Sequence, residues 1–242
     1  MELRPTAMVI ADISGYTKFM SLHRISLIHA EVIITDLLEV VTSSAKFPLK
    51  LNRLEGDAAF LYCDELGDNP REAINDIAKQ IARMMQEFAD KHRSMLEKSI
   101  GGCVCDACQH IDVLRLKVFA HFGDVVIKIA NGSIELGGEA PIVIHRMTKN
   151  SISSDEYVMA SADFCDFLDV PIYPHKEHGN ERYESIGNIA YVAYFPEPRR
   201  LDVSTVARLT RLTGIIEAFR LFARALFLRT HFSKMSFKKL PN

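Results

Sequence analysis

The amino-acid sequence predicts an α+β fold of the ferredoxin-like type, and three observations support this prediction. Apolar runs of strand length alternate with longer stretches in which apolar residues recur at helical spacing. The order of these segments is β-α-β-β-α-β, followed by further strands, which is typical of that fold. The composition is that of a globular protein, with 48% hydrophobic and 25% charged residues in a chain of 242.

The individual elements follow from apolar spacing and from turn residues. In the first half we expect a strand over 7–11, one long or two shorter helices over 16–46, strands over 47–54 and 58–62, and a helix from 70 to about 100. In the second half we expect two strands within 114–130 that bend near Gly123, a helix over 140–152, a strand over 157–160, a helical turn over 163–168, and a hairpin over 183–195 that turns at 187–188.

Two aspartates stand where apolar strands are expected to end. Asp12 closes the first strand, and Asp57 lies in the tight turn between the next two. Charged side chains are rarely placed at the ends of apolar strands without a partner. Two carboxylates on adjacent strands could hold two divalent cations for phosphoryl transfer. The alternative is that each aspartate only caps a turn, where Asp is common.

The sequence around these aspartates resembles the metal motifs of class III nucleotidyl cyclases. The run Val9-Ile10-Ala11-Asp12-Ile13-Ser14-Gly15-Tyr16-Thr17 is similar to the first motif, and Leu54-Glu55-Gly56-Asp57 is similar to the second. Residues 120–125 resemble the glycine-bearing strand of that family, and residues 135–138 and 145–147 resemble its substrate loop and its arginine-bearing helix. These matches span about residues 7–195. The run 145–150 and a cysteine loop also resemble a divergent bacterial branch of unknown function.

The resemblance implies a ferredoxin-like class III cyclase fold with a two-metal site. Asp12 and Asp57, assisted by the carbonyl group of Ile13, would hold two Mg²⁺ or Mn²⁺ ions. Phosphates of a nucleoside triphosphate would bind the backbone of Ser14, Gly15, Tyr16 and Thr17. Arg146 would neutralise charge on the transition-state phosphate. Because sites of this family lie across a head-to-tail homodimer, Arg146 would serve the metal pair of the partner chain.

Three positions depart from the cyclase pattern. The asparagine that positions the ribose in cyclases falls at Ile142, which cannot form a hydrogen bond. The base-reading lysine falls at Arg53, and its acidic partner falls at Glu135, so a purine could be read with altered geometry. We therefore expect weak or altered cyclisation of the triphosphate to a cyclic mononucleotide. The alternative is a non-catalytic cyclase-homologous module that signals through dimerisation or through partner or membrane binding.

The loop over 101–112 concentrates thiols. Zinc prefers four sulfur or nitrogen ligands in tetrahedral geometry, and closely spaced cysteines let one loop wrap the ion. The candidate zinc ligands in this loop are Cys103, Cys105, Cys108 and His110. The alternatives are reduced thiols without metal, a site that bridges a dimer, and a redox-sensitive cluster.

We expect a cyclase-like domain over 1–200 and a basic, apolar helical tail over 201–242. The segment 203–242 holds eight Lys or Arg residues and one Glu, although the whole chain carries a formal net charge of −2. Packing on the body or in a dimer interface explains such a helix, and peripheral contact with a membrane is the alternative. The near-neutral charge argues against nucleic acid as a partner. The sequence shows no signal peptide, which predicts a cytoplasmic protein.

Overall fold

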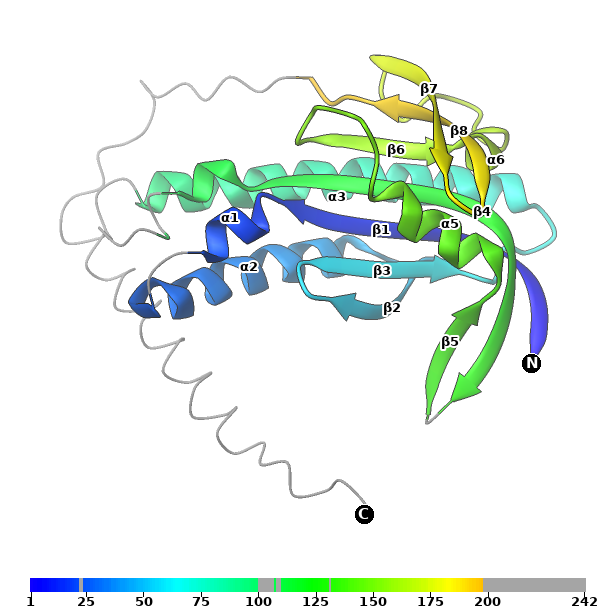
Figure 1. The fold of residues 1–242 in the computed structure, drawn as a ribbon, viewed down its shortest axis with the longest axis horizontal. Coiled ribbons are helices and arrows are strands. Elements are labelled where there is room, and N and C mark those ends of the chain that lie inside the picture. The colour runs from blue at the N-terminus through cyan, green and yellow to red at the C-terminus, as the bar shows by residue number, and fades with distance from the viewer. Residues whose placement is uncertain (22–23, 100–106, 108–109, 131, 198–242) are drawn as a thin grey trace. The chain divides into compact units, whose positions relative to one another are not determined.

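In the computed structural model, which describes residues 1–21, 24–99, 107, 110–130 and 132–197, eight strands form one mixed sheet (Figure 1). The strands are β1 (Glu2–Ser14), β2 (Lys50–Glu55), β3 (Ala58–Cys63), β4 (Arg115–Ala130), β5 (Ser133–Gly137), β6 (Tyr157–Ser161), β7 (Lys176–Tyr183) and β8 (Gly187–Tyr194). Their order across the sheet is β2-β3-β1-β4-β6-β8-β7, and β5 pairs with β4. The pair β4 and β6 is parallel, whereas the neighbouring pairs are antiparallel. The α+β prediction is confirmed.

The described residues belong to two compact units. The first unit contains the sheet, together with α5 (Glu139–Met147) and α6 (Ala162–Cys165). The second contains α1 (Tyr16–Met20) and the short 3₁₀ helix η1 (Ile111–Val113). The two long helices α2 (Arg24–Ser44) and α3 (Pro70–Ser99) contribute residues to both units. The expected 16–46 helical region is thus two helices, α1 and α2.

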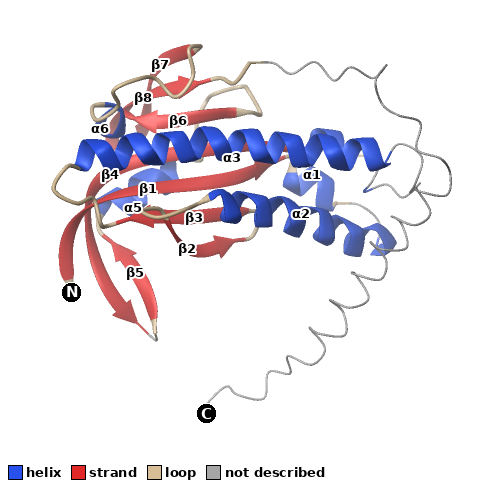
Figure 2. Cartoon of the chain, turned by 180° about the vertical axis from the view of Figure 1, so that it is seen from behind, coloured by secondary structure: helices blue, strands red, loops and turns tan. Residues whose placement is uncertain are grey.

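In the first unit, helices cover both faces of the sheet. Met8 and Ile10 of β1 pack in one buried cluster with Phe60, Phe119 and residues of α5. The part of α3 that belongs to this unit lies across the opposite face, where its apolar stripe is buried (Figure 2). Side chains alternate between the faces along a strand. Asp12 therefore projects toward the same face as Met8 and Ile10, two residues before the end of their strand.

Residues 115–130 form one strand of 16 residues and not the two that the sequence predicts. Gly123 lies within β4, and its lack of a side chain allows α5 to approach the strand. A Cβ atom at Gly123 would lie 2.8 Å from the Cβ of Ala140, the second residue of α5. The glycine is therefore a point of close packing and does not interrupt the strand.

We expect Gly123→Ala to lower the free energy of unfolding by about 1–3 kcal/mol, because the added methyl group must push α5 away from β4. Urea denaturation measures this change. Adding Ala140→Gly to Gly123→Ala returns the missing space and should recover part of the loss, although glycine within a helix itself costs about 1 kcal/mol. A fully stable Gly123→Ala protein would contradict the close contact.

Other boundaries also differ from those predicted. Helix α5 ends at Met147 and not at 152, because the side chain of Asn150 binds the backbone there. Its amide NH₂ donates to the carbonyl oxygen of Met147 at 2.8 Å, and its amide oxygen accepts from the backbone N–H of Ile152 at 2.9 Å. The last hairpin begins at Lys176, since β7 pairs with β8. Strand β7 is largely exposed, and an edge strand of this kind lacks the apolar run that predicts a strand. Strand β5 occupies most of the segment that was expected to be a substrate loop.

The tail over 201–242, and with it the predicted helical extension, lies outside the described residues. Among the described helices, none is both long enough and apolar enough to span a lipid bilayer.

Candidate metal and nucleotide site

Strand pairing brings Asp12 and Asp57 to the same end of two neighbouring strands. In the antiparallel pair of β1 and β3, Asp12 lies opposite Ala58, so Asp57 is the next residue beyond the paired region. The backbone N–H of Ile13 donates to the carbonyl oxygen of Asp57 at 3.1 Å. Gly56 has a φ of 66°, a left-handed conformation that glycine adopts without strain, and this closes the turn beside Asp57. The backbone therefore gathers the two aspartates predicted from the sequence.

The surroundings of both carboxyl groups disfavour their negative charge. Burial raises the pKa of Asp12 to about 6, with a further contribution from the nearby charge of Asp57, whereas Lys117 acts in the opposite direction. Burial also raises the pKa of Asp57, and a hydrogen bond from its own backbone opposes that shift. Two adjacent carboxylates with incompletely compensated charge form an environment that a divalent cation would stabilise.

We expect Asp12→Asn to raise the free energy of unfolding by about 1–2 kcal/mol at pH 7.5. The pKa of Asp12 is about 6 in the folded protein and 3.8 ordinarily, so the native carboxyl group binds its proton more tightly than the unfolded one. The penalty for ionising Asp12 is small at pH 4, grows as the pH rises from about 4 to about 6, and is constant above that range. Partial solvent exposure reduces it below the full shift.

Urea denaturation of the wild type and Asp12→Asn at pH 4 and at pH 7.5 measures this penalty. The stability advantage of the variant should be present at pH 7.5 and disappear at pH 4. An advantage of equal size at both pH values would contradict the electrostatic explanation.

Lys117 and Asp155 are neighbours of the aspartate pair that the sequence did not single out. Lys117 lies opposite Asp12 in the pairing of β1 and β4. Its Nζ atom is 3.5 Å from Oδ1 of Asp155 and 5.5 Å from the ring centroid of Tyr157. The hydroxyl group of Ser14 donates to the same Oδ1 at 3.1 Å. Only the register between β1 and β4 reveals the place of Lys117, and this register cannot be deduced from local sequence.

The four predicted phosphate-binding residues divide between the two units. Ser14 ends β1, and Gly15 follows it with a φ of 85°. Tyr16 and Thr17 are the first residues of α1, in the second unit. Their proposed contact with phosphate stays a prediction.

Arg53, predicted to read the base, has an ion-pair partner other than the one expected. Its Nε atom donates to Oε1 of Glu55 at 2.6 Å, and its guanidinium group lies 5.2 Å from the ring centroid of Phe60. Glu55 also approaches α5, because its Oε2 atom is 3.6 Å from Nδ1 of His145. Glu135 lies on β5, opposite Lys128 of β4. The carboxylate that engages Arg53 in this structure is therefore that of Glu55.

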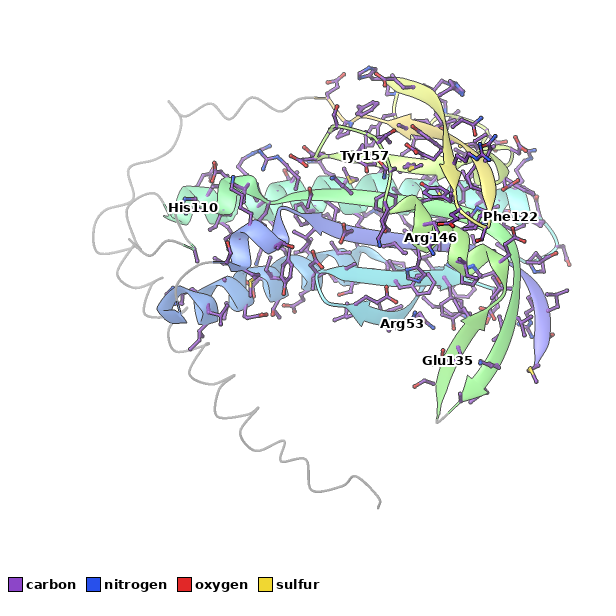
Figure 3. All side chains as sticks on the ribbon, viewed as in Figure 1. Arg53, His110, Phe122, Glu135, Arg146 and Tyr157 are labelled. Carbon is purple, nitrogen blue, oxygen red and sulfur yellow. The ribbon has the colours of Figure 1, made fainter. Side chains whose placement is uncertain are left out.

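The proposed transition-state residue Arg146 lies exposed on α5. Ile142, four residues earlier on the same helix, is 52% exposed and therefore occupies the surface position beside it. Figure 3 shows Arg53, Glu135 and Arg146 on β2, β5 and α5 of the first unit. Helix α5 carries both residues on the surface and buries Val143, Ile144 and Met147 against the sheet.

Most of the predicted zinc site falls outside the described residues, since Cys103, Cys105 and Cys108 are not among them. His110 is described and precedes η1, with its backbone N–H donating to the carbonyl oxygen of Ala107 at 3.2 Å. Among the residues that the structure describes, no three His, Cys, Asp or Glu side chains gather closely enough to hold a metal ion. The zinc hypothesis stays a prediction.

The sequence matches the model of a known protein family. The model of a family described as "Protein of unknown function (DUF2652)" matches residues 34–157, a little over half of the chain. The chain belongs to the DUF2652 family. A curated relative, the uncharacterized protein Rv2561/Rv2562 of Mycobacterium tuberculosis, is 32% identical over 152 residues, which are 63% of this chain and 68% of that protein.

The fold of this DUF2652 protein is similar to the catalytic domains of class III adenylyl and guanylyl cyclases. The adenylyl cyclase CyaB from P. aeruginosa superposes with a TM-score of 0.60 at 11% identity, covering 82% of this chain and 97% of that structure. The guanylyl cyclase Cya2 gives 0.58 at 10% identity, covering 81% and 95%. The Adenylate/Guanylate Cyclase/Hydrolase from Silicibacter pomeroyi gives 0.51 at 15% identity, covering 82% and 100%. At these identities the likeness shows the fold.

Proposed function

We propose that this DUF2652 protein is a divergent class III nucleotidyl cyclase-like homodimer that binds a nucleoside triphosphate with divalent metal and cyclises it weakly or in an altered way. The observation that carries the proposal is the meeting of Asp12 and Asp57 at the ends of adjacent strands, within a cyclase-like fold. A pair of carboxylates is costly in partly buried surroundings unless a cation compensates it.

The donor atoms suit Mg²⁺ or Mn²⁺. The carboxylates of Asp12 and Asp57 are hard oxygen ligands, and the carbonyl group of Ile13 would add a third. Because two carboxylates and a carbonyl do not complete an octahedron, the triphosphate would supply further oxygen atoms. Two such ions, when bound, would lower the pKa of the ribose 3′-hydroxyl and offset the charge of the phosphates.

Residues of this chain would position the substrate. The ammonium group of Lys117 and the hydroxyl group of Ser14 lie beside the aspartate pair and can bind phosphate oxygens. Arg146 would stabilise negative charge on the α-phosphate at the site of the partner chain. Exposed apolar side chains on β2, β5 and α5 support a second copy as the partner: Leu51, Leu54, Ile134 and Ile142.

Two observations favour a second candidate function, a non-catalytic module that signals through its dimer state or a partner. Ile142 cannot position a ribose hydroxyl group, and the Nε of Arg53 is already bound to Glu55. For either function we propose a cytoplasmic location, with no nucleic-acid partner. Peripheral membrane contact would involve the tail over 201–242.

Incubation of the purified protein with Mn²⁺ and each of ATP, GTP, CTP and UTP tests the proposal. The expected result is slow release of pyrophosphate together with a cyclic mononucleotide from at least one of the four. Metal-dependent binding without product would favour the non-catalytic module. Absence of both product and metal-dependent binding would contradict the leading proposal.

A further inference from the structure

Asp155 lies beside the proposed phosphate site and outside the pair of proposed metal ligands. It lies in the loop before β6, and its side chain is 74% exposed. One of its carboxylate oxygens contacts two groups, the hydroxyl of Ser14 at 3.1 Å and the Nζ of Lys117 at 3.5 Å. Ser14 and Lys117 come from β1 and β4, the two strands that pair at Asp12. Asp155 therefore bridges both strands at the position where phosphate is proposed to bind.

Carboxylate and phosphate oxygens are bound by the same donors, an ammonium and a hydroxyl among them. The side chain of Lys117 is only 20% exposed, and its Nζ atom lies over the ring of Tyr157. Its position is thus restricted by the sheet on one side and by Asp155 on the other. The hydroxyl group of Ser14 has a single hydrogen to donate, so a phosphate that is to accept it has to take the place of the Asp155 carboxylate, which also competes for the charge of Lys117.

We infer that Asp155 is a positioning residue that occupies the place of a phosphate group, holding Ser14 and Lys117 in the arrangement that binds the triphosphate and leaving them when the ligand arrives. This inference rests on the proposed function, which supplies the triphosphate as ligand. The three carboxyl groups of Asp12, Asp57 and Asp155 carry more negative charge than the single positive charge of Lys117 can balance. They therefore repel a triphosphate that carries no metal. Asp155 therefore makes binding more dependent on divalent cations.

The test uses the full chain and inorganic tripolyphosphate as the probe, with and without Mn²⁺, in isothermal titration calorimetry. Asp155→Asn keeps an acceptor for Ser14 and removes the charge that competes for Lys117. We expect this variant to bind metal-free tripolyphosphate about 3- to 10-fold more tightly than the wild type. The gain should decrease when Mn²⁺ is present and when the ionic strength is raised.

Asp169→Asn is the matched control, because it removes the same charge from an exposed ion pair with Arg71. Asp169 also lies away from Lys117. It follows α6 and is two residues from Phe167, and the ring of Phe167 packs on Phe122, in a part of β4 remote from Lys117. The affinity of Asp169→Asn for metal-free tripolyphosphate should differ from that of the wild type by less than twofold. In a Lys117→Met background the gain from Asp155→Asn should largely disappear, because the donor for which Asp155 competes is missing.

The outcomes separate the inference from the proposed function. If the wild type binds tripolyphosphate with Mn²⁺, but Asp155→Asn binds metal-free tripolyphosphate no more tightly than the wild type does, the inference is wrong and the proposed function stands. An equal gain in Asp169→Asn shows a general charge effect and also overturns the inference. If neither the wild type nor Asp155→Asn binds the probe under any condition, both are overturned.

Discussion

Asp57→Asn should reduce Mn²⁺-dependent nucleotide binding, and any cyclisation, at least 100-fold. The substitution removes one of the two carboxylates proposed to hold the metal, while the amide retains the shape of the side chain. The hydrogen bond that fixes the turn is made by the backbone carbonyl of Asp57 and survives the change. Burial raises the pKa of Asp57, so loss of its charge should not destabilise the fold.

Asp68→Asn is the appropriate control for Asp57→Asn. Asp68 is an exposed aspartate in the loop between β3 and α3, and the substitution makes the same chemical change. Calorimetry with a non-hydrolysable triphosphate should detect wild-type binding in Asp68→Asn and almost none in Asp57→Asn. Undiminished metal-dependent binding by a folded Asp57→Asn protein would refute the two-metal assignment.

Ile142→Asn should increase cyclisation, by about 10-fold or more, because a hydrogen-bonding side chain returns at the position that would orient the ribose. The position tolerates the change, since Ile142 is 52% exposed on α5 and the difference in helix propensity is a few tenths of a kcal/mol. The rate of cyclic-nucleotide formation with Mn²⁺ measures the effect.

Ile142→Ala separates the new hydrogen bond from the loss of apolar bulk. It should leave the rate near that of the wild type. If Ile142→Ala raises the rate as much as Ile142→Asn, the amide is not responsible. If neither variant forms product while both bind the metal–nucleotide complex, the non-catalytic module is the better account of this DUF2652 protein.

Local sequence was sufficient to predict the aspartate pair and the strands around it. An apolar run that ends at Asp12, and a Gly-Asp turn between two strands, are signals carried by a few consecutive residues. Antiparallel pairing of β1 and β3 then brings the two aspartates to the same end of the strand pair. The α+β class followed in the same way from the periodicity of the apolar residues.

The neighbours of the pair could not be predicted because they depend on contacts between distant segments. Ser14 and Asp155 are 141 residues apart in the chain, and neither lies in a motif that indicates their contact. The partner of Arg53 was also missed, although Glu55 is only two residues away and projects from the same face of β2. Strand periodicity could have identified that ion pair. The resemblance to cyclases instead predicts Glu135 as the partner.

Calorimetric titration of the wild-type protein with α,β-methylene nucleoside triphosphates, in Mn²⁺ and then in excess EDTA, tests whether the aspartate pair binds metal and triphosphate together. If Asp12 and Asp57 form a metal-dependent triphosphate site, at least one nucleotide should bind in Mn²⁺, and binding should vanish in EDTA and in Asp12→Asn. Absence of binding in Mn²⁺, or binding of equal strength in EDTA, would contradict that claim.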